Sequence, residues 1–149
     1  MQIAIAAPVA RVFALIDDPR ELARWQPVPT EILFDAAAPR GPGARYVIRT
    51  HWGGKAWDMP SETVARREPE HLAVRSLVAG RWVTTEWTLT WTGAATMARC
   101  RTYTERPAGL LGLWSRLLEP KENALALPGA REGLERLKRV AEAAHSASK

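Results

Sequence analysis

Six strand-like segments follow one another between residues 30 and 106, and no other feature of the sequence constrains the fold as strongly. Apolar and polar residues alternate in several of them, and stretches rich in glycine, proline or polar residues separate them. A Gly-Gly pair at 53–54 predicts a hairpin, and an Ala-Gly pair at 79–80 predicts another tight turn. Strands joined by such short turns indicate one meandering antiparallel sheet. The expected strands are Thr30–Phe34, Ala44–Trp52, Lys55–Arg67, Leu72–Val78, Arg81–Trp91 and Thr96–Arg106.

Two short helices are predicted before this sheet. Pro8 suits the first turn of a helix, because the N–H that it lacks has no partner there. The apolar residues that follow share one helix face, namely Val9, Val12, Phe13 and Ile16. Asp18 is placed to cap a second helix that begins at Pro19 and carries Leu22 and Trp25 on one side.

The chain returns to a helical pattern after Pro107. An apolar stripe opposite charged residues predicts a C-terminal helix, and it consists of Ala130, Leu134, Leu137 and Ala141. Pro120 and Pro128 divide the region into two or three helical pieces. With a short strand at residues 1–6, this order predicts an α+β fold. A bent antiparallel sheet of six to seven strands would carry the long helix across its concave face.

Size and composition narrow the class of protein. We expect a single domain over residues 1–149, because 149 residues form one ordinary core. The net charge is +5, but the arginines are scattered near acidic residues, which indicates a solvated surface rather than nucleic-acid binding. There is no apolar run of about 18 residues and no signal-like leader, so we expect a cytoplasmic protein without stable membrane insertion. A lone Cys100 and three dispersed histidines predict neither a metal site nor a cofactor.

Four segments of the sequence resemble the START-like or SRPBCC superfamily, which includes polyketide cyclase/dehydrase-type and Bet v 1-like proteins. They are "IAAPVARVFALIDDPRELARWQP", "GPGARY", "ETVARREPEHLAVRS" and "GLERLKRVAE". The resemblance covers nearly the whole chain, although the first strand is shorter than is usual in that superfamily. It implies the helix-grip fold, in which two short helices close one end of the sheet. Sheet and long helix then enclose a cavity that typically holds an apolar or amphipathic molecule.

A binding module for a small hydrophobic or aromatic ligand, lipid-like or polyketide-like, is therefore the first functional hypothesis. In the strand Arg81–Trp91 the more apolar set of alternate residues is expected to face the helix. Pro60 indicates an edge or a bulge and leaves open which face of its strand points inward. The face that carries Arg99 is either outward or a polar cavity wall. The residues expected to bind the ligand are Tyr46, Trp57, Met59, Trp87, Leu89, Trp91, Arg99 and Tyr103.

An enzyme of the cyclase/dehydrase kind is the alternative. It would need a cavity acid or base, because a buried carboxyl or imidazole can exchange protons near neutral pH. The weak candidates are His51, Glu62 and Glu86, each of which is more often a surface residue. A third hypothesis, a protein-binding module, would use the apolar segment Leu110–Leu118. The sequence leaves open whether the protein is a monomer or a homodimer.

Overall fold

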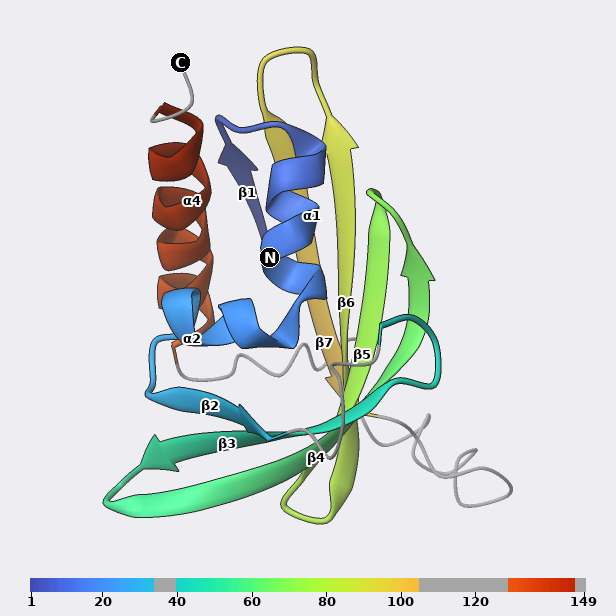
Figure 1. The fold of residues 1–149 in the computed structure, drawn as a ribbon, viewed down its shortest axis with the longest axis vertical. Coiled ribbons are helices and arrows are strands. Elements are labelled where there is room, and N and C mark those ends of the chain that lie inside the picture. The colour runs from blue at the N-terminus through green and yellow to red at the C-terminus, as the bar shows by residue number, and fades with distance from the viewer. Residues whose placement is uncertain (34–39, 105–128, 147–149) are drawn as a thin grey trace, which may run out of the picture.

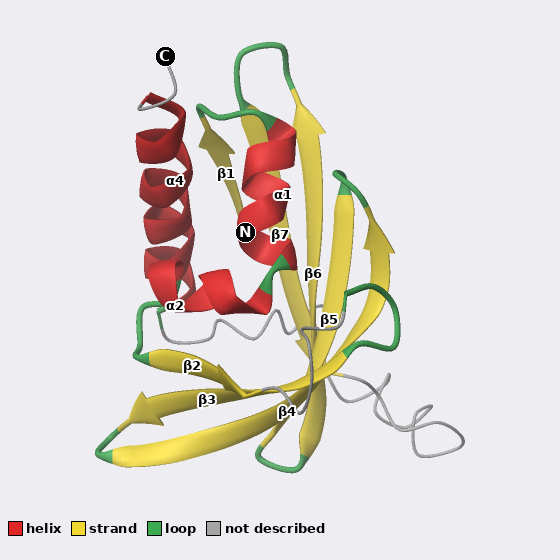
Figure 2. Cartoon of the chain, in the orientation of Figure 1, coloured by secondary structure: helices red, strands yellow, loops and turns green. Residues whose placement is uncertain are grey.

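The computed structural model describes residues 1–33, 40–104 and 129–146, and it contains one seven-stranded antiparallel sheet (Figures 1 and 2). The order of strands is β1-β7-β6-β5-β4-β3-β2. The predicted meander is confirmed from β2 to β7, and the short first strand pairs with β7 at the far edge. The strands are β1 Gln2–Ile5, β2 Thr30–Leu33, β3 Arg45–Trp52, β4 Lys55–Arg67, β5 His71–Val78, β6 Arg81–Trp91 and β7 Thr96–Thr104.

The sheet bends strongly, so that β2, β3 and the first half of β4 run away from β6 and β7 (Figure 1). The register between β4 and β5 shifts between Thr63 and Ala65, which marks a bulge in β4. Pro60 precedes this bulge, and the β4–β5 pairing begins only at Ser61. Strand β4 is therefore a sheet edge at Pro60, and one side of its backbone has no strand to pair with.

The helices begin and end close to where the sequence predicts. They are α1 Val9–Asp17, the 3-10 turn η1 Pro19–Glu21, α2 Leu22–Trp25 and α4 Ala130–Ser146. The Asp18 carboxylate accepts a hydrogen bond from the backbone N–H of Arg20 at 3.1 Å, which confirms the predicted cap. The expected helical segment Leu110–Leu118, Pro120 and Pro128 lie outside the described residues.

Helices α1 and α4 lie side by side on one face of the sheet (Figure 2). Helix α1 contacts β6, and α4 contacts α1, α2 and β1. Leu134, Leu137 and Ala141 of α4 are buried in one core with the apolar side of α1, so the predicted stripe does face the interior. The carboxylate of Glu142 accepts a hydrogen bond from the backbone N–H of Ala6 at 2.7 Å and so connects α4 to the segment that follows β1.

The described helices include none that is long and apolar enough to span a lipid bilayer.

Candidate functional site

Strand pairing assigns every strand residue to one of two faces. Trp87 and Leu89 of β6 are buried against the helices, as is Cys100, which lies opposite Trp87 on β7. The register carries this face across the sheet, because paired residues point to the same side. Thr63 lies opposite Val74, and Tyr46 lies opposite Ser61. We call the side that bears Trp87 the inner face and the opposite side the outer face.

The inner face continues past the packed core onto β3, β4 and the first half of β6. Apart from Lys55, Arg66 and Arg81 near the strand ends, its side chains there are apolar or carry a hydroxyl group. The apolar ones are Ile48, Met59, Val74 and Val83. The others form a contiguous group across five strands, which we call the hydroxyl patch: Tyr46, Ser61, Thr63, Ser76, Thr85, Thr102 and Thr104.

Hydrogen bonds within the hydroxyl patch order its side chains. The Ser61 hydroxyl donates to the backbone carbonyl of Met59 at 3.0 Å and lies 2.8 Å from the Ser76 hydroxyl. Since the Ser61 proton is used, its oxygen is left to accept from Ser76. Burial raises the pKa of Tyr46 to about 12, and a hydrogen bond with Thr63 opposes this rise. Tyr46 is therefore a neutral phenol at physiological pH.

All but two of the residues expected to bind a ligand lie on the inner face. Tyr46, Trp87 and Leu89 are buried, and Met59, in the arm formed by β3 and β4, is half-buried. Trp57 and Trp91 also occupy inner-face positions, but they lie near strand ends and are 50% and 47% exposed.

Arg99 and Tyr103 lie on the outer face, contrary to the expectation that they face a cavity. Strand β7 turns Ala98 and Cys100 into the core, and alternation then points Arg99 and Tyr103 the other way. The register therefore resolves the face that the sequence left open.

The three candidate acids and bases also lie on the outer face, where each has a charged or titratable partner. His51 Nε2 is 3.1 Å from a Glu31 carboxylate oxygen, and Glu86 is 2.9 Å from His71 Nε2. Glu62 accepts a hydrogen bond from Arg75 at 2.9 Å, and this bond lowers the pKa of Glu62. Within the described strands, no Asp, Glu or His occupies an inner-face position.

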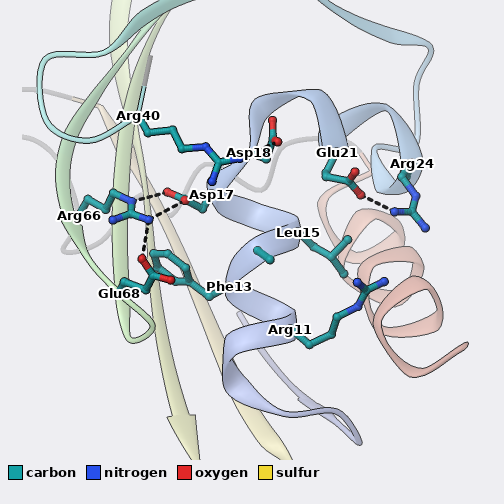
Figure 3. Close-up of a pocket in the computed structure, with 11 residues that line it drawn as sticks. Arg11, Phe13, Leu15, Asp17, Asp18, Glu21, Arg24, Arg40, Arg66 and Glu68 are labelled. Carbon is teal, nitrogen blue, oxygen red and sulfur yellow. Dashed lines mark hydrogen bonds and ion pairs between the residues drawn. The ribbon is translucent and has the colours of Figure 1, made fainter. Parts of the chain in front are cut away.

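A groove of about 260 Å³ lies between α1, the η1–α2 segment and the β4–β5 turn (Figure 3). Charged side chains line it, and its acidic groups are bound by arginines. Asp17 accepts two hydrogen bonds from Arg66, at 2.7 and 2.9 Å, and Glu21 pairs with Arg24. Sequence reasoning missed this groove, because its residues come from segments whose proximity depends on the fold.

The described residues contain no cluster of three or more His, Cys, Asp or Glu side chains that could hold a metal ion.

Comparisons with known proteins agree with this architecture. The family described as "Polyketide cyclase / dehydrase and lipid transport" matches residues 1–142. The search of curated proteins found no match.

Three solved structures illustrate the similarity of fold. Protein CV1439 from Chromobacterium violaceum superposes with a TM-score of 0.70 at 19% identity, covering 95% of each chain. TTHA0849 from Thermus thermophilus gives 0.66 at 20% identity, over 97% of this chain and 96% of that one. Ara h 8.0201 gives 0.65 at 12% identity, over 95% and 94%. The expected helix-grip α+β fold is confirmed.

Proposed function

This chain belongs to the polyketide cyclase / dehydrase and lipid transport family, as the sequence resemblance predicts, and we propose that it binds a small apolar or aromatic molecule against the inner face. The ligand would be lipid-like or polyketide-like. The observation that supports this proposal is the composition of the inner face beyond the core. Apolar side chains and the hydroxyl patch adjoin there, and small-molecule sites typically combine an apolar lining with a few polar groups.

The hydroxyl patch favours a ligand that carries neutral oxygen atoms. Ser, Thr and Tyr hydroxyls can both donate and accept hydrogen bonds, so they suit carbonyl and hydroxyl groups. Tyr46 contributes a neutral donor, because its pKa of about 12 keeps the phenol protonated. A ligand carboxylate or ammonium would be costly to bury against the hydroxyl patch itself, because the side chains of the patch are uncharged.

Binding is favoured over cyclase or dehydratase activity by the positions of the candidate acids and bases. A catalytic acid or base must come within hydrogen-bond reach of the reacting atom. His51, Glu62 and Glu86 point away from the inner face, and each is held by a partner. The described part of the sheet thus supplies groups that can hold a ligand rather than groups poised to move its protons.

A pair of matched substitutions on β6 tests the proposal. Thr85 lies on the inner face and Thr88 on the outer face of the same strand. Thr85→Phe should fill space that the ligand needs and weaken binding of the neutral probe Nile red by about tenfold, a change of about 1.4 kcal/mol. Thr88→Phe adds the same side chain to the opposite face and should leave the affinity unchanged.

Fluorescence titration measures the affinity, and native mass spectrometry of the purified protein would identify a co-purified ligand. Circular dichroism checks that both variants fold. Failure of every neutral apolar probe to bind, or equal weakening by Thr85→Phe and Thr88→Phe, would contradict the proposal.

A further inference from the structure

Two tryptophans are exposed at the tip of the arm formed by β3 and β4. Trp52 is 66% exposed and Trp57 is 50% exposed. Both occupy inner-face positions, Trp52 opposite Lys55 and Trp57 opposite Thr50. The Trp57 indole N–H donates to the backbone carbonyl of Trp52 at 3.3 Å, so the two residues are held together. Large apolar side chains grouped in this way on a protein surface commonly mark a site of interaction.

The arm diverges from β5, β6 and β7, and its tip reaches past the end of β2 (Figure 1). Strand β5 pairs with β4 only from Ser61 onward, and β2 pairs with β3 only as far as Thr50. The tip, residues 51–57, therefore extends beyond the neighbouring strands.

The two faces of the arm differ in chemistry. On the outer face, Arg49 donates two hydrogen bonds to Asp58, at 2.7 and 2.8 Å. His51 lies 3.1 Å from Glu31 on the same side. The tryptophan face carries Lys55, which forms no ion pair with any described residue. One face thus has mutually paired charges, and the other has two indoles and a cation that is open to solvent.

We propose that the Trp52–Trp57 face of the arm docks on the surface of an anionic lipid membrane. Tryptophan favours the membrane–water interface, because its ring is apolar and its N–H is polar. The amine of Lys55 beside the indoles and the net charge of +5 attract anionic lipid headgroups. The docking is peripheral and does not depend on the ligand-binding proposal. Where both hold, the inner face would open toward the bilayer.

Vesicle flotation tests this proposal with the full-length protein. The vesicles are phosphatidylcholine alone and phosphatidylcholine mixed with phosphatidylglycerol. Wild-type protein should float with the mixed vesicles and be partly released by salt, because salt screens the attraction. The double variant Trp52→Ser/Trp57→Ser should bind about tenfold or more weakly, because it loses two large apolar contacts.

Trp91→Ser is the matched control, because Trp91 is 47% exposed but ends β6, far from the arm. It should float like the wild type. Lys55→Glu leaves both indoles in place and should weaken binding to the mixed vesicles. Nile red binding without vesicles should be unchanged in Lys55→Glu, which separates this test from that of the ligand site.

Three outcomes would overturn the proposal. They are no flotation of the wild-type protein, flotation that persists in the double variant, and an equal loss in Trp91→Ser. Sedimentation velocity adds a fourth. A wild-type dimer that becomes monomeric in the double variant would make the arm a contact between two copies of the chain.

Discussion

The indole of Trp25 meets the indole of Trp87 edge to face, with the ring centroids 5.9 Å apart and the ring planes at 85°. Trp25 ends α2, and Trp87 lies in the middle of β6. The Trp25 N–H also donates to the carbonyl of Leu15 in α1 at 3.0 Å. One buried side chain therefore joins both short helices to the inner face of the sheet, and the helix pair closes this end of the fold.

Trp25→Ala should destabilise the protein by about 3–5 kcal/mol, because it removes a large buried side chain and leaves a cavity. It also leaves the Leu15 carbonyl without its indole donor. Urea unfolding followed by circular dichroism measures the change. Trp91→Ala is the control, and since Trp91 is half-exposed, it should cost much less. Equal losses for the two variants would contradict the structural role of Trp25.

Arg66 and Asp17 form a partly buried ion pair between β4 and α1. The Asp17 side chain is 6% exposed, and the guanidinium of Arg66 also lies 5.3 Å from the centre of the Phe13 ring (Figure 3). The hydrogen bond to Asp17 raises the pKa of Arg66 further above its already high ordinary value, so the arginine stays charged.

Arg66→Met should cost about 3 kcal/mol, because it leaves the buried Asp17 carboxylate without a cation. The double variant Asp17→Asn/Arg66→Met should recover part of that loss. Arg67→Met is the matched control on the same strand, because the Arg67–Glu70 pair is exposed and should contribute less than about 1 kcal/mol. Urea unfolding of all three variants checks this. If the double variant were no more stable than Arg66→Met alone, the loss in Arg66→Met could not be attributed to an unpaired Asp17 carboxylate.

The elements of this fold could be predicted from the sequence because each depends on local chemistry. The spacing of Val12, Phe13 and Ile16 indicates a helix, and Asp18 before Pro19 indicates a cap. The face of a strand is a weaker signal, since alternation separates two sets of residues without saying which set is buried. Strand β7 has Cys100 on one side and Tyr103 on the other, and only its pairing with β6 shows that Cys100 is the inner one.

Contacts between distant segments could not be predicted from the sequence, because they depend on strand register and on where the helices lie. His71 meets Glu86, and Arg66 meets Asp17, because β5 pairs with β6 in one register and α1 lies over one part of the sheet. A shift of one residue would turn each of these strand side chains to the opposite face.

Tyr46 should make the protein less stable in alkali. Its pKa is about 12 in the folded protein and 10.0 ordinarily, so the unfolded chain loses the proton first as the pH rises. The stabilising effect is complete below pH 10 and declines between pH 10 and 12, by on the order of 2 kcal/mol. Urea unfolding across this range should show a shallower decline for Tyr46→Phe. An unchanged slope would mean that the phenol titrates normally in the folded protein.

Cys100 should react slowly with thiol reagents while the protein is folded. The residue is 7% exposed, and burial raises the pKa of its thiol to about 11. Because the thiolate is the reactive form, both effects protect it at pH 8. Ellman's reagent should label the native protein far more slowly than the urea-unfolded protein. Labelling at similar rates in the two states would show that Cys100 is accessible from solvent.

A substitution in the turn between β5 and β6 should make the protein more stable. Ala79 has φ of +49°, a left-handed conformation that is unfavourable for a residue with a Cβ, and Gly80 follows with φ of +78°. Two-residue turns of this kind favour Asn or Gly at the first position. Ala79→Asn should therefore raise the free energy of unfolding by about 0.5–1 kcal/mol. Gly53 occupies the corresponding position of the β3–β4 turn with φ of +60°. Gly53→Ala should therefore lower the free energy of unfolding by a similar amount. Urea unfolding measures both, and a loss of stability in Ala79→Asn would contradict the turn conformation.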